Sequence, residues 1–280
     1  MKLEVLGSGG AVTTPRPACD CRVCVEARER GLPYSRTGPS FFLHGPDVLF
    51  DTPEESKAQL NRSGIPRVAA CFYSHWHPDH VMGRRIFESL HADWRQWPHR
   101  ALGRSTIYLP QQVAVDFRER LAGWEHLAFM AERGWIEVVE LRDGQSVSLG
   151  GVQIAPFRVA EDYVYAFLLA ERGKRALLAP DELVGWDPPK HARGVDLAIL
   201  PMGICEFDPL TGERRIDADH HALRFEASFP ETLTIVERLG AARTVLAHIE
   251  ELDGLSHDDL GELGRRYGVE FAFDTMVLDI

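Results

Sequence analysis

Short apolar segments rich in β-branched and aromatic residues alternate along the chain with longer amphipathic segments, and no linker separates them. The short segments predict strands and the long ones helices, so their order indicates an α/β fold in a single domain, 1–280. Asp258 and Asp259 suit the first turn of the last helix, and Gly268 suits its end. The predicted strands are 1–6, 40–43, 48–50, 68–73, 107–109, 136–141, 152–157, 165–170, 175–179, 197–200, 243–247 and 271–278. The predicted helices are about 54–63, 80–91, 112–121, 124–132, 229–239 and 257–267.

A polar heptad, Ser-His-Trp-His-Pro-Asp-His, follows an apolar run and fills residues 74–80. This pattern predicts a loop between a buried strand and a helix, where chemistry commonly lies. If the chain stays extended, its first two histidines lie on one side of the backbone, about 6 to 7 Å apart. Pro78 then turns the chain, so the last two ligands point elsewhere, which suggests two metal ions of zinc, iron or manganese. The four potential ligands are His75, His77, Asp79 and His80.

The heptad resembles the His-x-His-x-Asp-His hallmark of the metallo-β-lactamase superfamily, in which x is any residue. This resemblance implies an αββα sandwich of two mixed β-sheets flanked by helices, with the metal site at the strand ends. It further implies that Asp181 bridges the two metals and that His248 binds the second one. The expected metal ligands are therefore His75, His77, Asp79, His80, Asp181 and His248.

One ligand expected from the resemblance is missing. The superfamily usually supplies a third histidine to the first metal from the region before the strand that leads to Asp181, and Ala160 stands at that place. Glu161 and Asp162 are candidate oxygen ligands, and a weak or empty first site is the alternative. We therefore expect one or two catalytic divalent ions, with the second site the more dependable.

Three thiols, Cys19, Cys21 and Cys24, lie in a segment rich in Pro, Arg and Gly at about 13–39. The first ten residues predict a strand and a glycine turn instead of a secretory signal, so we expect a cytoplasmic protein with reduced cysteines. Clustered thiolates favour a structural zinc, which needs a fourth ligand from elsewhere in the fold.

The thiol cluster and the heptad together resemble the subgroup that contains the cyclic phosphodiesterase of the carbon-phosphorus lyase pathway and protein B of pyrroloquinoline quinone biosynthesis. In that phosphodiesterase a histidine three residues after the last metal-binding histidine completes the zinc site. Glu251 stands at the matching position here, and His257 is a competing candidate.

The charge balance narrows the class of substrate. A formal net charge of −11 weighs against a general nucleic-acid-binding protein, which normally shows a basic surface. No apolar segment has the length of a membrane span, so we expect no membrane association. A small-molecule phosphodiester is the expected substrate, and a homodimer is left open.

The resemblance implies hydrolysis of a small phosphodiester, cyclic ones included, by a metal-bound hydroxide. Asp79 is the residue expected to orient the water, and His221, in a polar loop, is the candidate general acid. Solvated histidines without a role are the alternative for that loop. Two other functions remain open: cofactor biosynthesis by different metal chemistry, and a non-catalytic metal-binding module with a degenerate first site.

Overall fold

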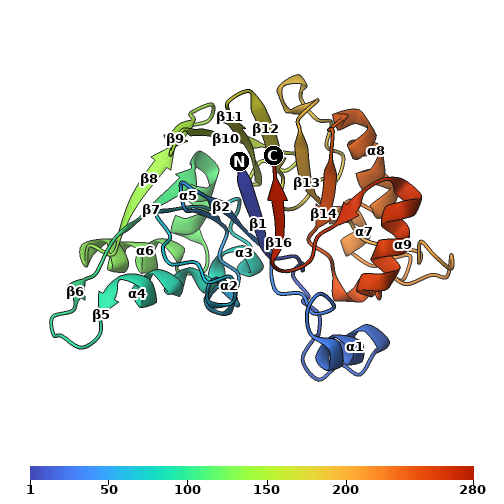
Figure 1. The fold of residues 1–280 in the computed structure, drawn as a ribbon, viewed down its shortest axis with the longest axis horizontal. Helices are drawn as coiled ribbons and strands as arrows, with labels where there is room; N and C mark the ends of the chain where they lie inside the picture. Colours follow the sequence, from blue (N-terminus) through green and yellow to red (C-terminus); the bar gives the residue numbers. More distant parts are fainter.

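The computed structural model describes residues 1–280, which form two seven-stranded mixed sheets (Figure 1). Each sheet has six pairs of neighbouring strands, of which three are parallel and three are antiparallel. The first sheet has the order β16 (Met276–Asp279), β1 (Lys2–Gly7), β2 (Ser40–His44), β3 (Val48–Phe50), β4 (Ala70–Phe72), β7 (Ser105–Pro110), β8 (Ile136–Leu141). The second has the order β15 (Glu270–Phe271), β14 (Thr244–Ala247), β13 (Leu197–Pro201), β12 (Lys174–Leu178), β11 (Tyr165–Glu171), β10 (Val152–Arg158), β9 (Val147–Leu149).

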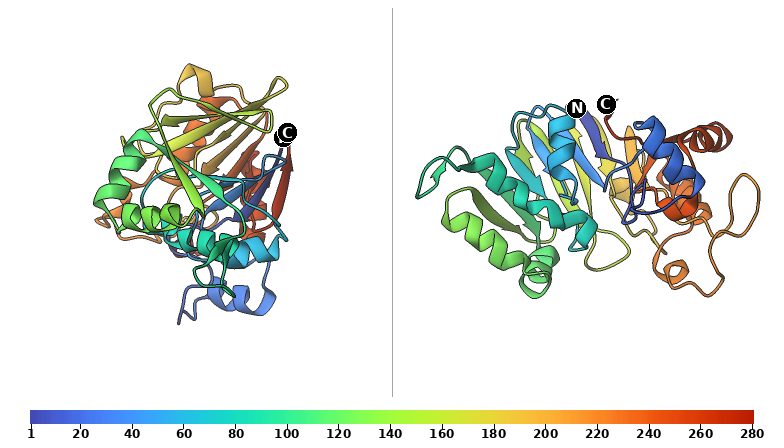
Figure 2. Two further views of the ribbon diagram at one scale, coloured as in Figure 1. Left: turned by 90° about the vertical axis from the view of Figure 1, so that its left-hand side faces the viewer. Right: turned by 90° about the horizontal axis from the view of Figure 1, so that it is seen from below.

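The inner faces of the sheets pack on each other around aromatic residues such as Phe50, Phe72 and Phe167. Helices cover both outer faces, and Figure 2 shows the resulting layers from two further sides. Apolar positions of α2 (Ser56–Arg62), α4 (Ile86–His91), α5 (Gln111–Glu119) and α6 (Gly123–Glu132) pack on the first sheet, and those of α8 (Phe229–Leu239) and α9 (His257–Tyr267) pack on the second. The structure therefore confirms the predicted αββα sandwich.

Helices α8 and α9 have the predicted bounds, because local signals fix both ends of each. Ser228 and Ser256 cap their N-termini in capping boxes, and left-handed Gly240 and Gly268 end them. Asp259 completes the box of α9, as its place in the first turn predicts.

Two predicted elements are divided in the structure, and several elements were not predicted. The helix predicted at 80–91 is split into α3 (Pro78–Val81), a 3₁₀ turn and α4, because Gly83 packs against the Pro53 backbone with no room for a side chain. The strand predicted at 271–278 is split into β15 and β16. The thiol segment holds an unpredicted helix, α1 (Arg22–Arg30), which projects below the sheets in Figure 1. Other unpredicted elements are β5 (Ala92–Asp93), β6 (Arg100–Ala101), β9 and α7 (Ala222–Phe225).

Strand ends determine where polar side chains gather. Asp51 follows β3, the heptad follows β4, and His248 follows β14, while Asp181 lies shortly after β12. Because these strands run in parallel pairs within their sheets, their carboxyl ends lie at the same edge of the sandwich. None of the helices combines the length and apolar character that a membrane crossing requires.

Candidate metal centre

The heptad leaves β4 and turns where the sequence predicts. His77 is extended, with φ −59° and ψ 147°, and precedes Pro78, the first residue of α3. Asp79 and His80 lie within that short helix, so their side chains leave the backbone in a different direction from that of His75. His75 and His80 are fully buried.

Two groups of donor atoms result, and in each group the atoms lie within 4.8 Å of one another. The first group comprises His75, His77, Asp181 and Glu182. The second comprises Asp79, His80 and His248.

Asp181 joins the two groups. Its Oδ2 lies 3.5 Å from Nε2 of His75 and 3.7 Å from Nε2 of His80, and its Oδ1 lies 3.5 Å from Nε2 of His248. One carboxylate therefore faces donors of both groups, which is the arrangement that a bridging ligand requires. All six metal ligands expected from the resemblance are brought to this one place.

The donor chemistry fits divalent metal ions. Nε2 of His75, His80 and His248 and Oδ2 of Asp79 are buried polar atoms without a hydrogen-bond partner. Such atoms are costly in a folded protein unless something binds them. Imidazole nitrogens and carboxylate oxygens in this ratio suit zinc, manganese or iron.

The protein's own charges at the centre shift several pKa values. Burial disfavours charge on the His248 imidazole, but Asp181 and Asp79 outweigh burial and raise its pKa to about 10. Burial, aided by the charge of His75, lowers the pKa of His77 to about 4. Burial, aided by the charge of Asp181, raises the pKa of Glu182 to about 7. His248 therefore holds a proton near neutral pH. A metal ion would have to displace this proton, because it binds only the neutral imidazole.

Glu182 is the residue that the sequence did not single out. The predicted oxygen substitutes, Glu161 and Asp162, are not part of either donor group, and Ala160 is exposed to solvent. Glu182 is buried, and its Oε1 lies 3.3 Å from Nδ1 of His77. Its position directly after Asp181 was the available signal.

The thiol cluster forms a separate site. Oε1 of Glu251 lies 3.3 Å from Sγ of Cys19 and 3.1 Å from Sγ of both Cys21 and Cys24. Burial raises the pKa of the Cys24 thiol to about 12, so a cation is needed to hold three thiolates here. The four side chains match the number of donors of a structural zinc site, with a carboxylate in place of the usual fourth cysteine or histidine.

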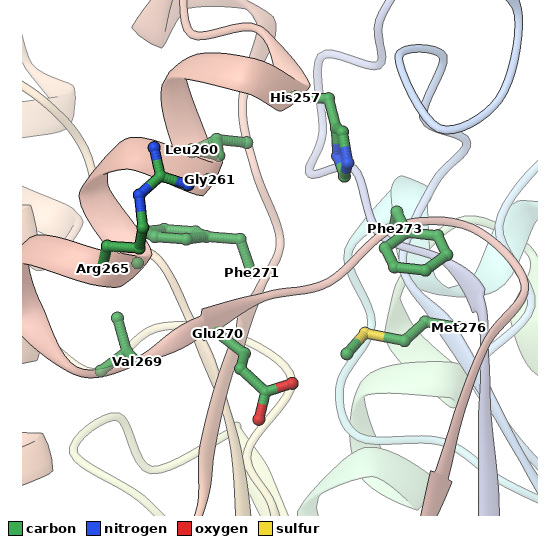
Figure 3. Close-up of a pocket in the computed structure, with 10 residues that line it drawn as sticks. His257, Leu260, Gly261, Arg265, Val269, Glu270, Phe271, Phe273 and Met276 are labelled. Atoms are coloured by element: carbon green, nitrogen blue, oxygen red, sulfur yellow. The ribbon is translucent and has the colours of Figure 1, made fainter.

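His257, the competing fourth ligand, lies elsewhere. It lines a groove of about 370 Å³ between α9 and the β15–β16 segment, together with Leu260, Phe271, Phe273 and Met276 (Figure 3). Its ring packs edge-on against Tyr34 and Phe273. The geometry therefore favours Glu251 over His257 as the partner of the three thiols.

A cavity of about 370 Å³ opens beside the second donor group. Asp181 and His248 line it, and so does His221, the predicted general acid. Glu226 and Glu250 add two carboxylates to its wall. The volume suits a small molecule.

Two donor groups that share one aspartate, at the strand ends of an αββα sandwich, define a metallo-β-lactamase-type centre. The sequence model of the beta-lactamase superfamily domain matches residues 39–249, and the chain belongs to this family. This places the protein among the metallo-β-lactamase superfamily hydrolases, which are generally metal-dependent.

Solved structures share the whole fold. A diphosphatase of the PhnP family is 24% identical, with a TM-score of 0.71, and the alignment covers 100% of this chain and 97% of that one. Zinc-bound PqqB from Methylobacterium extorquens is 15% identical, with a TM-score of 0.71 and 100% of both chains covered. YhfI from Bacillus subtilis is 15% identical, with a TM-score of 0.67, covering 99% of this chain and 98% of its own. The resemblance read from the two motifs is confirmed.

A curated relative matches part of the chain. An octanoyltransferase from Porphyromonas gingivalis is 31% identical over 124 residues, which are 43% of this chain and 23% of that protein. The chain thus spans less than a quarter of the length of this relative.

Proposed function

We propose that the protein hydrolyses a small phosphodiester. The observation that carries the proposal is that two donor groups sharing Asp181 adjoin a cavity that also holds His221. Divalent cations bound by these donors would polarise a phosphoryl oxygen and lower the pKa of water. The likeness to a PhnP-family diphosphatase supports phosphorus-oxygen chemistry.

Protein side chains supply the remaining steps. A carboxylate oxygen of Asp79 accepts a hydrogen bond from the attacking water and so orients it toward phosphorus. The imidazole of His221 makes no hydrogen bond with the protein, and His221 lines the cavity. Its imidazolium gives its proton to the leaving oxygen, which would otherwise depart as an alkoxide.

The cavity wall indicates what else the substrate carries. The Glu250 carboxylate accepts hydrogen bonds from the backbone N–H groups of Ala11 and Val12, at 2.9 and 2.8 Å, and is thereby fixed. Glu226 is half-buried and has no such partner. A carboxylate that faces a cavity without a hydrogen-bond donor favours ligand groups that donate hydrogen bonds. Hydroxyl or amino groups are therefore expected on the part of the substrate away from phosphorus.

Hydrolysis of two phosphodiesters tests the proposal. His221→Ala should lower kcat about 10²-fold or more for an alkyl leaving group, and much less for p-nitrophenolate, which leaves without a proton. His220→Ala is the matched control, because His220 stacks on His221 at a ring distance of 4.8 Å and lines the same cavity. Asp181→Asn should abolish hydrolysis of both substrates. Undiminished turnover of bis(p-nitrophenyl) phosphate by metal-depleted Asp181→Asn would contradict the proposal.

An acyl ester is the second candidate substrate, on the strength of the partial match to an octanoyltransferase. The same centre can direct water to a carbonyl carbon. p-Nitrophenyl octanoate, assayed beside the phosphodiesters, separates the two candidates. The carboxylates in the cavity wall disfavour an octanoyl chain, because they would have to pack against apolar groups.

A further inference from the structure

The first donor group contains a second carboxylate, Glu182, beside its two histidines and Asp181. Ala160 has no donor atom and is exposed, and its neighbours Glu161 and Asp162 do not reach the group. Glu182 does reach it, from the segment that follows β12.

Three contacts fix the Glu182 side chain in this direction. The hydroxyl of Tyr163 donates a hydrogen bond of 2.6 Å to its Oε2, which leaves Oε1 facing Nδ1 of His77 at 3.3 Å. Its backbone N–H donates to Oδ1 of Asp181 at 2.8 Å. Its φ of +48° lies in the left-handed region, which a glutamate adopts only where the surroundings impose it.

We propose that Glu182 replaces the missing histidine as a ligand of the first metal. The two sites then have the same donor set: two imidazoles and one carboxylate each, with Asp181 shared. The first site takes His75, His77 and Glu182, and the second takes His80, His248 and Asp79.

The replacement sets the donor chemistry of both sites. Two imidazoles and one carboxylate are the donor set of non-haem iron(II) sites and of many catalytic zinc sites, and the additional carboxylate also suits manganese. Three carboxylates against two divalent cations leave a net charge of +1, which one hydroxide neutralises. The centre therefore suits a matched pair of divalent ions, with Mn²⁺ as the probe in the experiment below.

Metal binding tests this inference without any substrate, although the inference rests on the two-metal centre of the proposed function. The full-length protein is stripped by chelation and loaded with Mn²⁺, and bound metal is counted by mass spectrometry. Two adjacent Mn²⁺ ions also give a spin-coupled electron paramagnetic resonance signal that a single ion lacks. Glu182→Ala should lose one equivalent of Mn²⁺ together with the coupled signal.

Two further variants sharpen the experiment. Glu161→Gln removes a neighbouring carboxylate outside the donor groups, so it should keep both ions and the coupled signal. Glu182→Gln keeps the shape of the side chain and the hydrogen bond from Tyr163, so it guards against misfolding of Glu182→Ala. It should weaken the first site by more than the roughly 10- to 100-fold that loss of an outer-shell partner costs.

Two results would overturn the inference: a coupled pair that survives in both Glu182 variants, or a wild-type protein that binds a single Mn²⁺. A pair that disappears only in the Glu182 variants supports it. If the pair disappears in this way but no phosphodiester is cleaved by the wild type, the ligand assignment stands and the proposed reaction fails.

Discussion

Nδ1 of His80 donates a hydrogen bond of 2.9 Å to Oδ2 of Asp51, and both side chains are buried. The same carboxylate accepts hydrogen bonds from the backbone N–H and the hydroxyl of Ser74, at 2.8 and 2.6 Å. Asp51 therefore ties the start of the heptad to the end of β3. It also fixes the His80 ring so that Nε2 faces the second donor group, as outer-shell carboxylates do in metal sites.

We expect Asp51→Asn to weaken metal binding at the second site by about 10- to 100-fold, because the ring of His80 loses its charged partner. Titration calorimetry of the chelated protein with Mn²⁺ measures the change. Asp47→Asn is the matched control, since Asp47 lies four residues away and pairs with Arg67 on the surface. Equal losses in the two variants would refute a positioning role for Asp51.

The heptad could be predicted as a metal site from the sequence, whereas the role of Asp51 could not, because the heptad is contiguous and the contact of Asp51 with His80 is not. His75, His77, Asp79 and His80 are contiguous, so their spacing alone predicts a metal site. Asp51 follows an apolar strand, as many polar residues do. Only the pairing of β3 with β4 brings its carboxylate beside His80, and such non-local contacts leave no mark in a single sequence.

Tyr163 should act on the first site through Glu182. We expect Tyr163→Phe to lower the affinity for the first Mn²⁺ about 10-fold, because Glu182 then loses the partner that orients its carboxylate. Calorimetry and the coupled resonance signal check this, and the second site should bind as before. Tyr165→Phe is the comparison, since the hydroxyl of Tyr165 donates to Asp143, away from the donor groups. Unchanged affinity in Tyr163→Phe would show that the hydroxyl of Tyr163 does not position Glu182 for metal binding.

The sequence could not show Glu182 for a related reason. Its side chain reaches the site because the backbone takes a left-handed conformation, which sequence patterns predict reliably only for glycine and asparagine. The predicted substitutes, Glu161 and Asp162, have suitable chemistry but are not part of either donor group. By contrast, α8 and α9 were predictable because their capping boxes and terminal glycines are local.

The thiol site makes a paired prediction. Glu251→Ala should lose the zinc bound by Cys19, Cys21 and Cys24, whereas His257→Ala should keep it. Zinc content by mass spectrometry decides between the two. Loss of the ion should also lower the melting temperature, by roughly 2 to 4 °C for each kcal/mol of stability lost. Zinc loss in His257→Ala alone would reverse the ligand assignment.

Metal binding should release protons near neutral pH. The imidazole of His248 has its pKa raised to about 10 by Asp181 and Asp79, against the opposing effect of burial, so it holds a proton at pH 8. A metal needs the neutral ring, and the apparent affinity should therefore rise with pH up to about 10. Calorimetry at pH 8 in two buffers of different ionisation enthalpy should give different heats. Identical heats would show that no proton leaves.

Gly10 lies where the N-terminal turn meets the second donor group. A Cβ atom at this position would lie 2.6 Å from Cδ of Glu250 and 2.7 Å from Nδ1 of His248, closer than real side chains come. Neither neighbour can yield freely, because Glu250 is held by two backbone N–H groups and His248 is buried in the centre.

We therefore expect Gly10→Ala to cost about 1 to 3 kcal/mol, the usual penalty for overpacking. Most of this cost should arise because the added methyl group displaces the His248 ring from its position in the second donor group. This corresponds to metal affinity at the second site that is about 5- to 150-fold lower. Gly261→Ala in α9 is the control, since its nearest neighbour is a flexible arginine tip at 3.8 Å. Calorimetry should show weaker binding in Gly10→Ala only. Normal affinity in Gly10→Ala would mean that the turn moves aside to make room for the methyl group. The position of His248 would then not depend on a glycine at position 10.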